Sequence, residues 1–211
     1  MGKPSPTGND SRDARCMANA RRWVAFLRAV NVGKRRTPME KLRSEIADLD
    51  FGGVRLVDVS TYLNSGNVIF TAAGVRLGSR HKLEAAIEER LEETFGFEVT
   101  TFVRTDEEVA EILARAPFRS GSGATPEGHT HMVMLLKDQP PREVCDAIEE
   151  LSGKRDRLEV HGSEVHWLIE GKSLDTALER RDWKVLGDRP NTTRNLTMLT
   201  KLQQRLPLLP D

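Results

Sequence analysis

Residues 54–71 read VRLVDVSTYLNSGNVIFT, and this stretch decides the fold. β-Branched and other apolar residues fill both flanks, whereas the middle carries the Asn, Ser and Gly residues that favour tight turns. The pattern predicts a β-hairpin, with one strand over 54–63 and another over 67–71. A two-residue turn at Ser65–Gly66 would pair Leu63 with Val68 on one face of the sheet.

Helical and extended segments flank this hairpin in a regular order. Upstream, the spacing predicts an apolar strand over 23–30 and an amphipathic helix over 38–49, which would begin at a capping box of Thr37, Pro38 and Glu40. Downstream, it predicts a long amphipathic helix over 83–95 and a strand over 99–104. The resulting order, βαββαβ, is that of a ferredoxin-like fold.

The second half of the chain follows the same outline less regularly. The patterns predict a bridging helix, then strand, helix, two strands, a helix and a terminal helix, at about 109–116, 131–137, 141–151, 158–161, 165–169, 174–180 and 196–206. We therefore expect an α+β protein of two ferredoxin-like halves, each an antiparallel sheet with helices on one face. The expected division is a disordered tail over 1–21, a ferredoxin-like subdomain over 22–104, and a second α+β subdomain with a C-terminal helix over 105–211.

Composition and charge exclude several classes of protein. The 211 residues contain 32 Lys plus Arg and 32 Asp plus Glu, so no overall basic field favours nucleic acid. The two cysteines, Cys16 and Cys145, provide neither a disulfide framework nor a zinc-ligand spacing. No apolar run predicts a signal peptide or approaches the ~20 residues of a membrane span, so we expect a cytoplasmic protein with no membrane association. For the N-terminus, two interpretations stay open: either Met17 is the true start of the protein, or the tail is an extension of the folded part.

Three short polar runs stand out against this background. They are LRAVNVG over 27–33, YLNSGNV over 62–68, and TTRN over 192–195, which leads toward Lys201. In a βαββαβ sheet the first two strands run parallel, so the loop after the first strand and the hairpin emerge at the same edge. The start of the helix at 38–49 and the turn at 95–97 open onto that edge as well.

On these three runs the chain resembles the family of domain of unknown function 1697 (DUF1697), over about residues 22–205. The family carries a Leu-Arg-Gly-Ile-Asn-Val-Gly opening, a Gln-Ser-Gly-Asn-Val turn and a Thr-x-Arg-Asn-Trp close. The resemblance implies no activity, because the family has none assigned. Ala29 and Lys34 replace two family glycines and so indicate that glycine is not strictly required there, Asn64 replaces a Gln, and Leu196 replaces an indole that could have stacked on a ligand.

The polar edge predicts a site for a small anionic ligand. A helix N-terminus presents free N–H groups and partial positive charge, and Lys34, Arg35 and Arg36 stand directly before one. Arg194 and Asn195 would reach this edge from the second half. Neither a Walker loop nor a GxGxxG motif is present, so no cofactor is expected. The candidate ligand-binding residues are Arg28, Asn31, Gly33, Lys34, Asn64, Ser65, Gly66, Asn67, Arg194, Asn195 and Lys201.

Each of these motifs also has a purely structural interpretation. The run at 64–67 would serve only to close a hairpin, Arg28 would form an ion pair that satisfies its charge within the fold, and a Thr or Asn of the last run would cap the final helix. Two other functions stay open, a nucleic-acid-binding protein and a protein-interaction module. The strand at 67–70 has one aromatic and no basic residue, which disfavours base stacking.

Other groups point to no particular chemistry. His129 and His131 share a strand face and His161 and His166 flank a turn, but no Cys, Asp or Glu recurs at ligand spacing, so no metal is expected. Ser65 lacks the surroundings of a nucleophile elbow. The glutamates at 84, 88, 89, 92 and 93 are interpreted as a solvated helix face. No catalytic residue, reaction or oligomeric state follows from the sequence.

Overall fold

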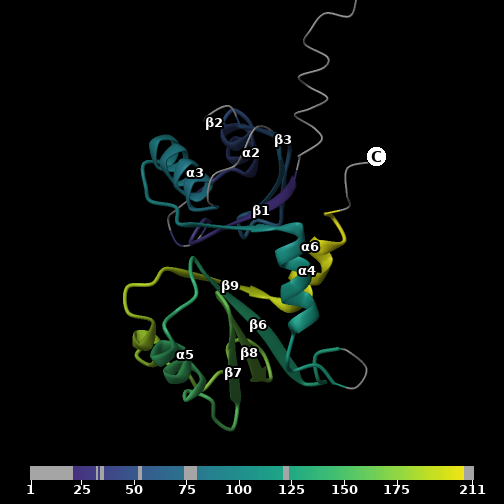
Figure 1. Ribbon diagram of the computed structural model, residues 1–211, viewed down its shortest axis with the longest axis vertical. Coiled ribbons are helices and arrows are strands. Elements are labelled where there is room, and N and C mark those ends of the chain that lie inside the picture. The colour runs from purple at the N-terminus through teal and green to yellow at the C-terminus, as the bar shows by residue number, and fades with distance from the viewer. Residues whose placement is uncertain are drawn as a thin grey trace, which may run out of the picture. The chain divides into compact units, whose positions relative to one another are not determined.

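The computed structural model describes residues 21–31, 33, 36–51, 54–73, 80–120 and 124–206 (Figure 1). The chain divides into two compact units, the first ending at Asp106 and the second beginning at Glu107. Each unit is an antiparallel sheet with helices packed on it, so the protein is α+β with two βαββαβ-like halves, as predicted. Apart from Arg21, which begins the first strand, the predicted tail lies outside the described residues.

The first unit has the strand order of a ferredoxin-like sheet. Its sheet order is β2-β3-β4-β1-β5, and β1 is antiparallel to both β4 and β5. Because β2 has only two residues, four strands span the sheet. In chain order the elements are β1 (Arg21–Leu27), α2 (Met39–Ala47), β2 (Asp50–Phe51), β3 (Val54–Tyr62), β4 (Asn67–Ala73), α3 (Arg80–Phe95) and β5 (Thr101–Thr105).

One apolar cluster holds α2 and α3 on this sheet. Alternate residues of β1 contribute to it, as period-2 burial requires. Both helices contribute residues at three- and four-residue spacing, which is the pattern that identified them in the sequence. The buried members include Trp23, Ala25 and Leu27 of β1, Leu42 and Ile46 of α2, and Leu83, Ile87 and Leu91 of α3.

The hairpin forms where predicted but in a different register. Tyr62 pairs with Asn67 and Thr61 with Val68, so the turn has four residues rather than two. The cause is the buried Asn67 side chain, whose Nδ2 donates to the carbonyl oxygen of Tyr62 at 2.9 Å and to Ser65 Oγ at 3.0 Å. The predicted pairing of Leu63 with Val68 is therefore wrong.

The predicted capping box before α2 is also wrong. Pro38 is the N-cap residue, and no side chain caps the helix. The backbone N–H of Thr37 instead donates to Asn31 Oδ1 at 2.8 Å. The polar groups before the helix thus connect to the loop after β1.

The second unit repeats the topology with its own sheet order, β7-β8-β6-β9. Its elements are α4 (Asp106–Arg115), β6 (His129–Leu136), α5 (Arg142–Glu149), β7 (Asp156–His161), β8 (Glu164–Glu170), the 3-10 helix η1 (Asp182–Leu186), β9 (Asn191–Asn195) and α6 (Leu196–Gln203). Helix α5 and η1 cover one face through a cluster that includes Met134, Leu136, Ile148, Leu158, Val165 and Leu186.

The helix expected over 174–180 does not form. The buried carboxylate of Asp156 holds this segment in irregular conformation, because it accepts hydrogen bonds from Thr176 Oγ1 at 2.7 Å and from the Ala177 N–H at 2.8 Å. The same carboxylate accepts from Trp167 Nε1 at 2.8 Å. A tertiary contact therefore overrides the local helical pattern.

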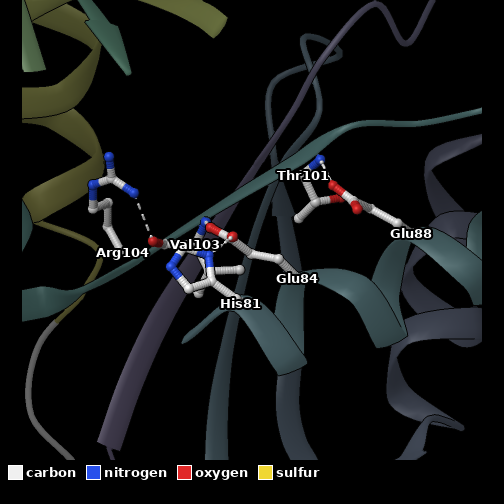
Figure 2. A network of polar contacts seen from close by, with 6 residues as sticks. All are labelled: His81, Glu84, Glu88, Thr101, Val103 and Arg104. Carbon is white, nitrogen blue, oxygen red and sulfur yellow. Dashed lines mark hydrogen bonds and ion pairs between the residues drawn. The ribbon is translucent and has the colours of Figure 1, made fainter. Parts of the chain in front are cut away.

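Helix side chains close one sheet edge in each unit. In the first unit, Glu84 Oε1 accepts the Val103 N–H at 2.8 Å and Glu88 Oε1 accepts the Thr101 N–H at 2.7 Å (Figure 2). These N–H groups belong to β5, at the end of the sheet order. Glu84 is fully buried, so its assignment to a solvated helix face is wrong.

The second unit closes the β7 edge in the same manner. Glu149 Oε1 of α5 accepts the Val160 N–H at 2.8 Å, and Ser152 Oγ accepts the Leu158 N–H at 2.9 Å. Acceptors from a helix or its end thus replace a neighbouring strand, which protects the edge against pairing with another chain.

We expect Glu84→Ala to destabilise the protein by about 1–3 kcal/mol, because it leaves the buried Val103 N–H without an acceptor. Urea unfolding monitored by circular dichroism measures the loss. Glu92→Ala, on the exposed face of the same helix, is the control and should change stability by less than about 0.5 kcal/mol. Equal losses in the two variants would contradict the role given to Glu84.

Candidate functional site

Three chain segments of the first unit meet where β1 ends. The Leu27 N–H donates to the carbonyl oxygen of Gly66 at 2.8 Å, and the Arg28 N–H donates to that of Thr100 at 2.8 Å. The loop after β1, the β3–β4 hairpin and the start of β5 therefore share one edge, as the topology predicted. We call the described residues Arg28, Asn31, Gly33, Arg36, Thr37, Asn64 and Ser65 the polar edge.

Asn31 ties the polar edge together. Its Oδ1 accepts the Thr37 N–H at 2.8 Å, and its Nδ2 donates to the carbonyl oxygens of Thr37 at 3.2 Å and Asn64 at 3.1 Å. One amide side chain thus joins the loop after β1, the segment before α2 and the hairpin. Asparagine suits this position because it adopts the left-handed conformation, here with φ +56°, more readily than most residues.

Close packing at this edge requires a glycine at position 66. Gly66 has φ +76°, and a Cβ placed there would lie 2.2 Å from Val30 Cγ2 and 3.0 Å from Leu27 Cβ. The hairpin and the loop after β1 approach so closely that no side chain fits between them. Gly66 and Asn67 therefore serve the structure of the hairpin, in agreement with the structural interpretation of this motif.

Ala29 occupies a backbone conformation that glycine favours. Its φ is +56°, in the left-handed region where a Cβ is strained. The sequence predicted that position 29 does not strictly require the family's glycine. The structure agrees only to the extent that alanine is tolerated there. Lys34, the other replaced glycine, lies outside the described residues.

The charge of Arg28 is not used within the described structure. The residue is exposed just beyond the end of β1, and its guanidinium forms no hydrogen bond or ion pair with any described residue. The interpretation of Arg28 as half of a structural ion pair is therefore wrong. It rested on a strand through residue 30, whereas β1 ends at Leu27 and leaves Arg28 in solvent.

The start of α2 offers hydrogen-bond donors without acceptors. The first intrahelical bond runs from the Leu42 N–H to the Pro38 carbonyl, so the N–H groups of residues 39–41 precede it, and no side chain caps them. Thr37, directly before the helix, is 2% exposed, and its Oγ1 has no partner among the residues that the structure describes. A buried hydroxyl without a partner is costly unless something else satisfies it.

A family model described as a protein of unknown function, DUF1697, matches residues 20–166. The chain belongs to this family. The matched part holds the polar edge and ends within the second unit, before the run at 192–195. No curated protein matches this DUF1697 chain.

A solved structure shares the fold of this DUF1697 protein. It is that of the conserved bacterial protein SP0830 from Streptococcus pneumoniae, with a TM-score of 0.67 and 23% sequence identity. The similarity covers 89% of this chain and 98% of that chain. At this level of identity it supports the arrangement of strands and helices.

The predicted site residues of the second unit have structural partners there. Arg194 lies on β9 and is 7% exposed, and one guanidinium nitrogen donates to Thr192 Oγ1 at 2.8 Å and to the Thr193 carbonyl at 3.0 Å. Its burial lowers its pKa to about 10. Asn195 caps α6, since its Oδ1 accepts the Thr197 N–H at 2.8 Å, which agrees with the capping interpretation. Lys201 is exposed on α6.

The strand β9 itself was not predicted. Its sequence, NTTRN, has no apolar alternation that would mark a strand. It pairs with β6 through the backbone, with Thr193 opposite Met134 and Arg194 opposite Val133. The reach of Arg194 and Asn195 toward the polar edge stays a prediction.

A buried histidine pair is the feature of the second unit that the sequence analysis missed. His131 Nε2 lies 3.0 Å from His166 Nδ1, and both side chains are almost fully buried. The signal was present, because His131 alternates in register with the apolar residues at 133 and 135. Among the residues that the structure describes, no three His, Cys, Asp or Glu side chains are placed to hold a metal ion. In the same part of the chain, no helix is long and apolar enough to cross a membrane.

We expect Ala29→Gly to stabilise the protein by about 1 kcal/mol, because it relieves a left-handed alanine. Thermal and urea unfolding measure the gain. Ala47→Gly is the opposite control: it lies within α2 and should destabilise by up to about 1 kcal/mol. Loss of stability in Ala29→Gly would show that the left-handed conformation at this position carries no strain.

Proposed function

We propose that the polar edge binds a small anionic ligand that carries a phosphate or carboxylate group. The observation that supports it most is the buried Thr37 hydroxyl, which has no partner in the described part of the chain and stands beside the uncapped N-terminus of α2. An anion oxygen would accept hydrogen bonds from both. The oligomeric state and any reaction lie outside this proposal.

The charges around this helix start favour an anion. The N-terminus of a helix carries about half a positive charge. Arg28 and Arg36 are exposed beside it, and neither guanidinium is neutralised by a carboxylate within the described residues. Glu40 is the acidic residue of the first helical turn, and it is exposed and forms no cap. The balance of charge near the helix start is positive.

Arg28 provides the recognition element with a defined geometry. A guanidinium presents a planar fork of donors that matches two oxygens of a carboxylate or a phosphate. The side chain amide of Asn64 is exposed at the same edge, whereas Asn31 is fully engaged in holding the loops together. We assign ligand contact to Arg28 and Thr37, and a positioning role to Asn31.

The geometry favours this proposal over recognition of nucleic acid by base stacking. In a ferredoxin-like RNA-binding sheet, aromatic side chains of the central strands lie exposed for stacking. Here Phe70, the aromatic residue of β4, is fully buried in the cluster beneath α2 and α3. A small ligand at the polar edge needs no such exposed ring.

We also propose that this binding protein is cytoplasmic.

The proposal is tested by thermal shift and calorimetry with inorganic phosphate, nucleotides, sugar phosphates and small carboxylates. A ligand at 100 times its dissociation constant should stabilise the protein by about 2.7 kcal/mol. Arg28→Ala should weaken binding by about tenfold or more, because a charge-assisted pair is lost. Thr37→Val, which replaces a hydroxyl without a partner, should weaken binding while the protein without ligand stays folded.

Arg55→Ala is the matched control, because Arg55 is an exposed arginine of the same unit on β3, near the far end of the strand from the hairpin. It should leave binding unchanged. The absence of a shift with every compound would overturn the proposal. An equal loss in the Arg28 and Arg55 variants would do so too, since it would show attraction to charge alone.

A further inference from the structure

The buried histidine pair of the second unit joins two strands of the sheet. His131 belongs to β6 and His166 to β8, and their rings meet edge to face with centroids 5.2 Å apart. The ring of His161, from β7, lies 5.7 Å from that of His166. Three imidazoles thus form a row across neighbouring strands.

Phe118, from a short segment after α4, packs against His131 at one end of this row. The Phe118 ring is 4% exposed, and its centroid lies 5.4 Å from that of His131. The guanidinium of Arg157 lies 4.9 Å from the centroid of the same ring. Phe118 therefore packs between an imidazole and an arginine that both come from the sheet.

The hydrogen bonding of the pair favours neutral rings. A neutral imidazole carries one N–H, so one ring donates to the other across the 3.0 Å contact. The two outer nitrogens, His131 Nδ1 and His166 Nε2, are buried and have no partner among the described residues. In the neutral pair, the accepting ring carries its own N–H on one of these nitrogens. A proton would place a further N–H, together with its charge, on the other nitrogen, where no described acceptor lies.

Most of the charged groups that face the pair are arginines, and these oppose a further positive charge. Arg115 pairs with Glu111, and the Glu159 carboxylate lies 3.4 Å from His161 Nε2. Burial and the Arg119 charge lower the pKa of His131 to about 4, and burial together with neighbouring positive groups lowers that of His166 to about 3. The facing groups are Arg115 and Arg119 from α4 and the segment after it, Arg157, Glu159 and His161 on β7, Glu164 on β8 and Arg194 on β9.

We propose that the His131–His166 pair is an acid-sensitive clasp that holds Phe118 against the second sheet and releases it when one of the two imidazoles takes up a proton. Proton uptake removes the condition under which the pair fits its site, namely two neutral rings that share one N–H. Movement of Phe118 gives the charged ring access to water.

The direction of the pH dependence follows from linkage. The closed form binds fewer protons than an open form in which the histidines titrate near 6.5. The closed form is therefore fully favoured above pH 6.5, and its population decreases as the pH falls. With a closed-form pKa of about 4, His131 alone raises the opening equilibrium about 30-fold between pH 7.5 and pH 5. The opening equilibrium therefore changes mainly in mildly acidic solution.

Hydrogen exchange of the full-length chain at pH 7.5 and pH 5.0, corrected for the intrinsic rate, tests the clasp. Amides in a peptide covering 115–120 should lose protection by about tenfold or more at pH 5.0, whereas those of α5 over 142–149 should keep theirs. In the double variant His131→Gln/His166→Gln, the protection of this segment should not depend on pH, and each single variant should show a smaller dependence than the natural protein. The control His129→Gln changes an exposed histidine of the same strand and should respond like the natural protein.

Histidine titration by NMR on the natural protein gives a second readout that does not depend on any variant. Both buried rings should titrate below pH 5, and titration near 6.5 would overturn the proposal. An unchanged Phe118 segment at pH 5.0 would overturn it as well. A pH response that persists in the double variant would show that another group releases the segment.

Discussion

The structure depends on satisfying the backbone N–H groups that its antiparallel sheets direct outward at their edges. Each unpaired N–H that is buried costs free energy comparable to a lost hydrogen bond, and each exposed one invites another strand. Glu84 and Glu88 satisfy those of β5, and Glu149 and Ser152 those of β7. This requirement explains why glutamates lie where helices approach a sheet edge, and why Glu84 is buried at all.

The end of β1 obeys a second requirement, close approach of backbone segments. Gly66 lets the hairpin contact Leu27 and Val30 directly, and Asn31 joins the neighbouring loops by three hydrogen bonds. The rigid part of the motif therefore consists of residues whose polar groups already have hydrogen-bond partners within the fold. What this framework presents outward is the Arg28 guanidinium and the start of α2, and the buried Thr37 hydroxyl lies directly before that helix.

Sequence periodicity predicted the order of elements because most of them bury one face, and burial at period 2 or 3.6 is visible in the residues. It failed where a single polar side chain decides the backbone. Asn67 sets the hairpin register, and Asp156 prevents a helix at 174–180. At the site, the meeting of the loops followed from topology, whereas the unused charge of Arg28 and the free hydroxyl of Thr37 depended on where β1 ends and α2 begins, to within a few residues.

The two units share a topology, but in each unit helix side chains protect a different edge strand of the sheet. In the first unit the acceptors come from the helix after the hairpin and cover the last strand, whereas in the second they come from the helix before the hairpin and its end, and cover the second strand. The second unit has only the short η1 and an irregular segment in place of that later helix. If the two halves were superposed by strand order, the aligned residues would therefore have unrelated structural roles. The two halves are therefore not interchangeable, because each protects a different strand with a different helix.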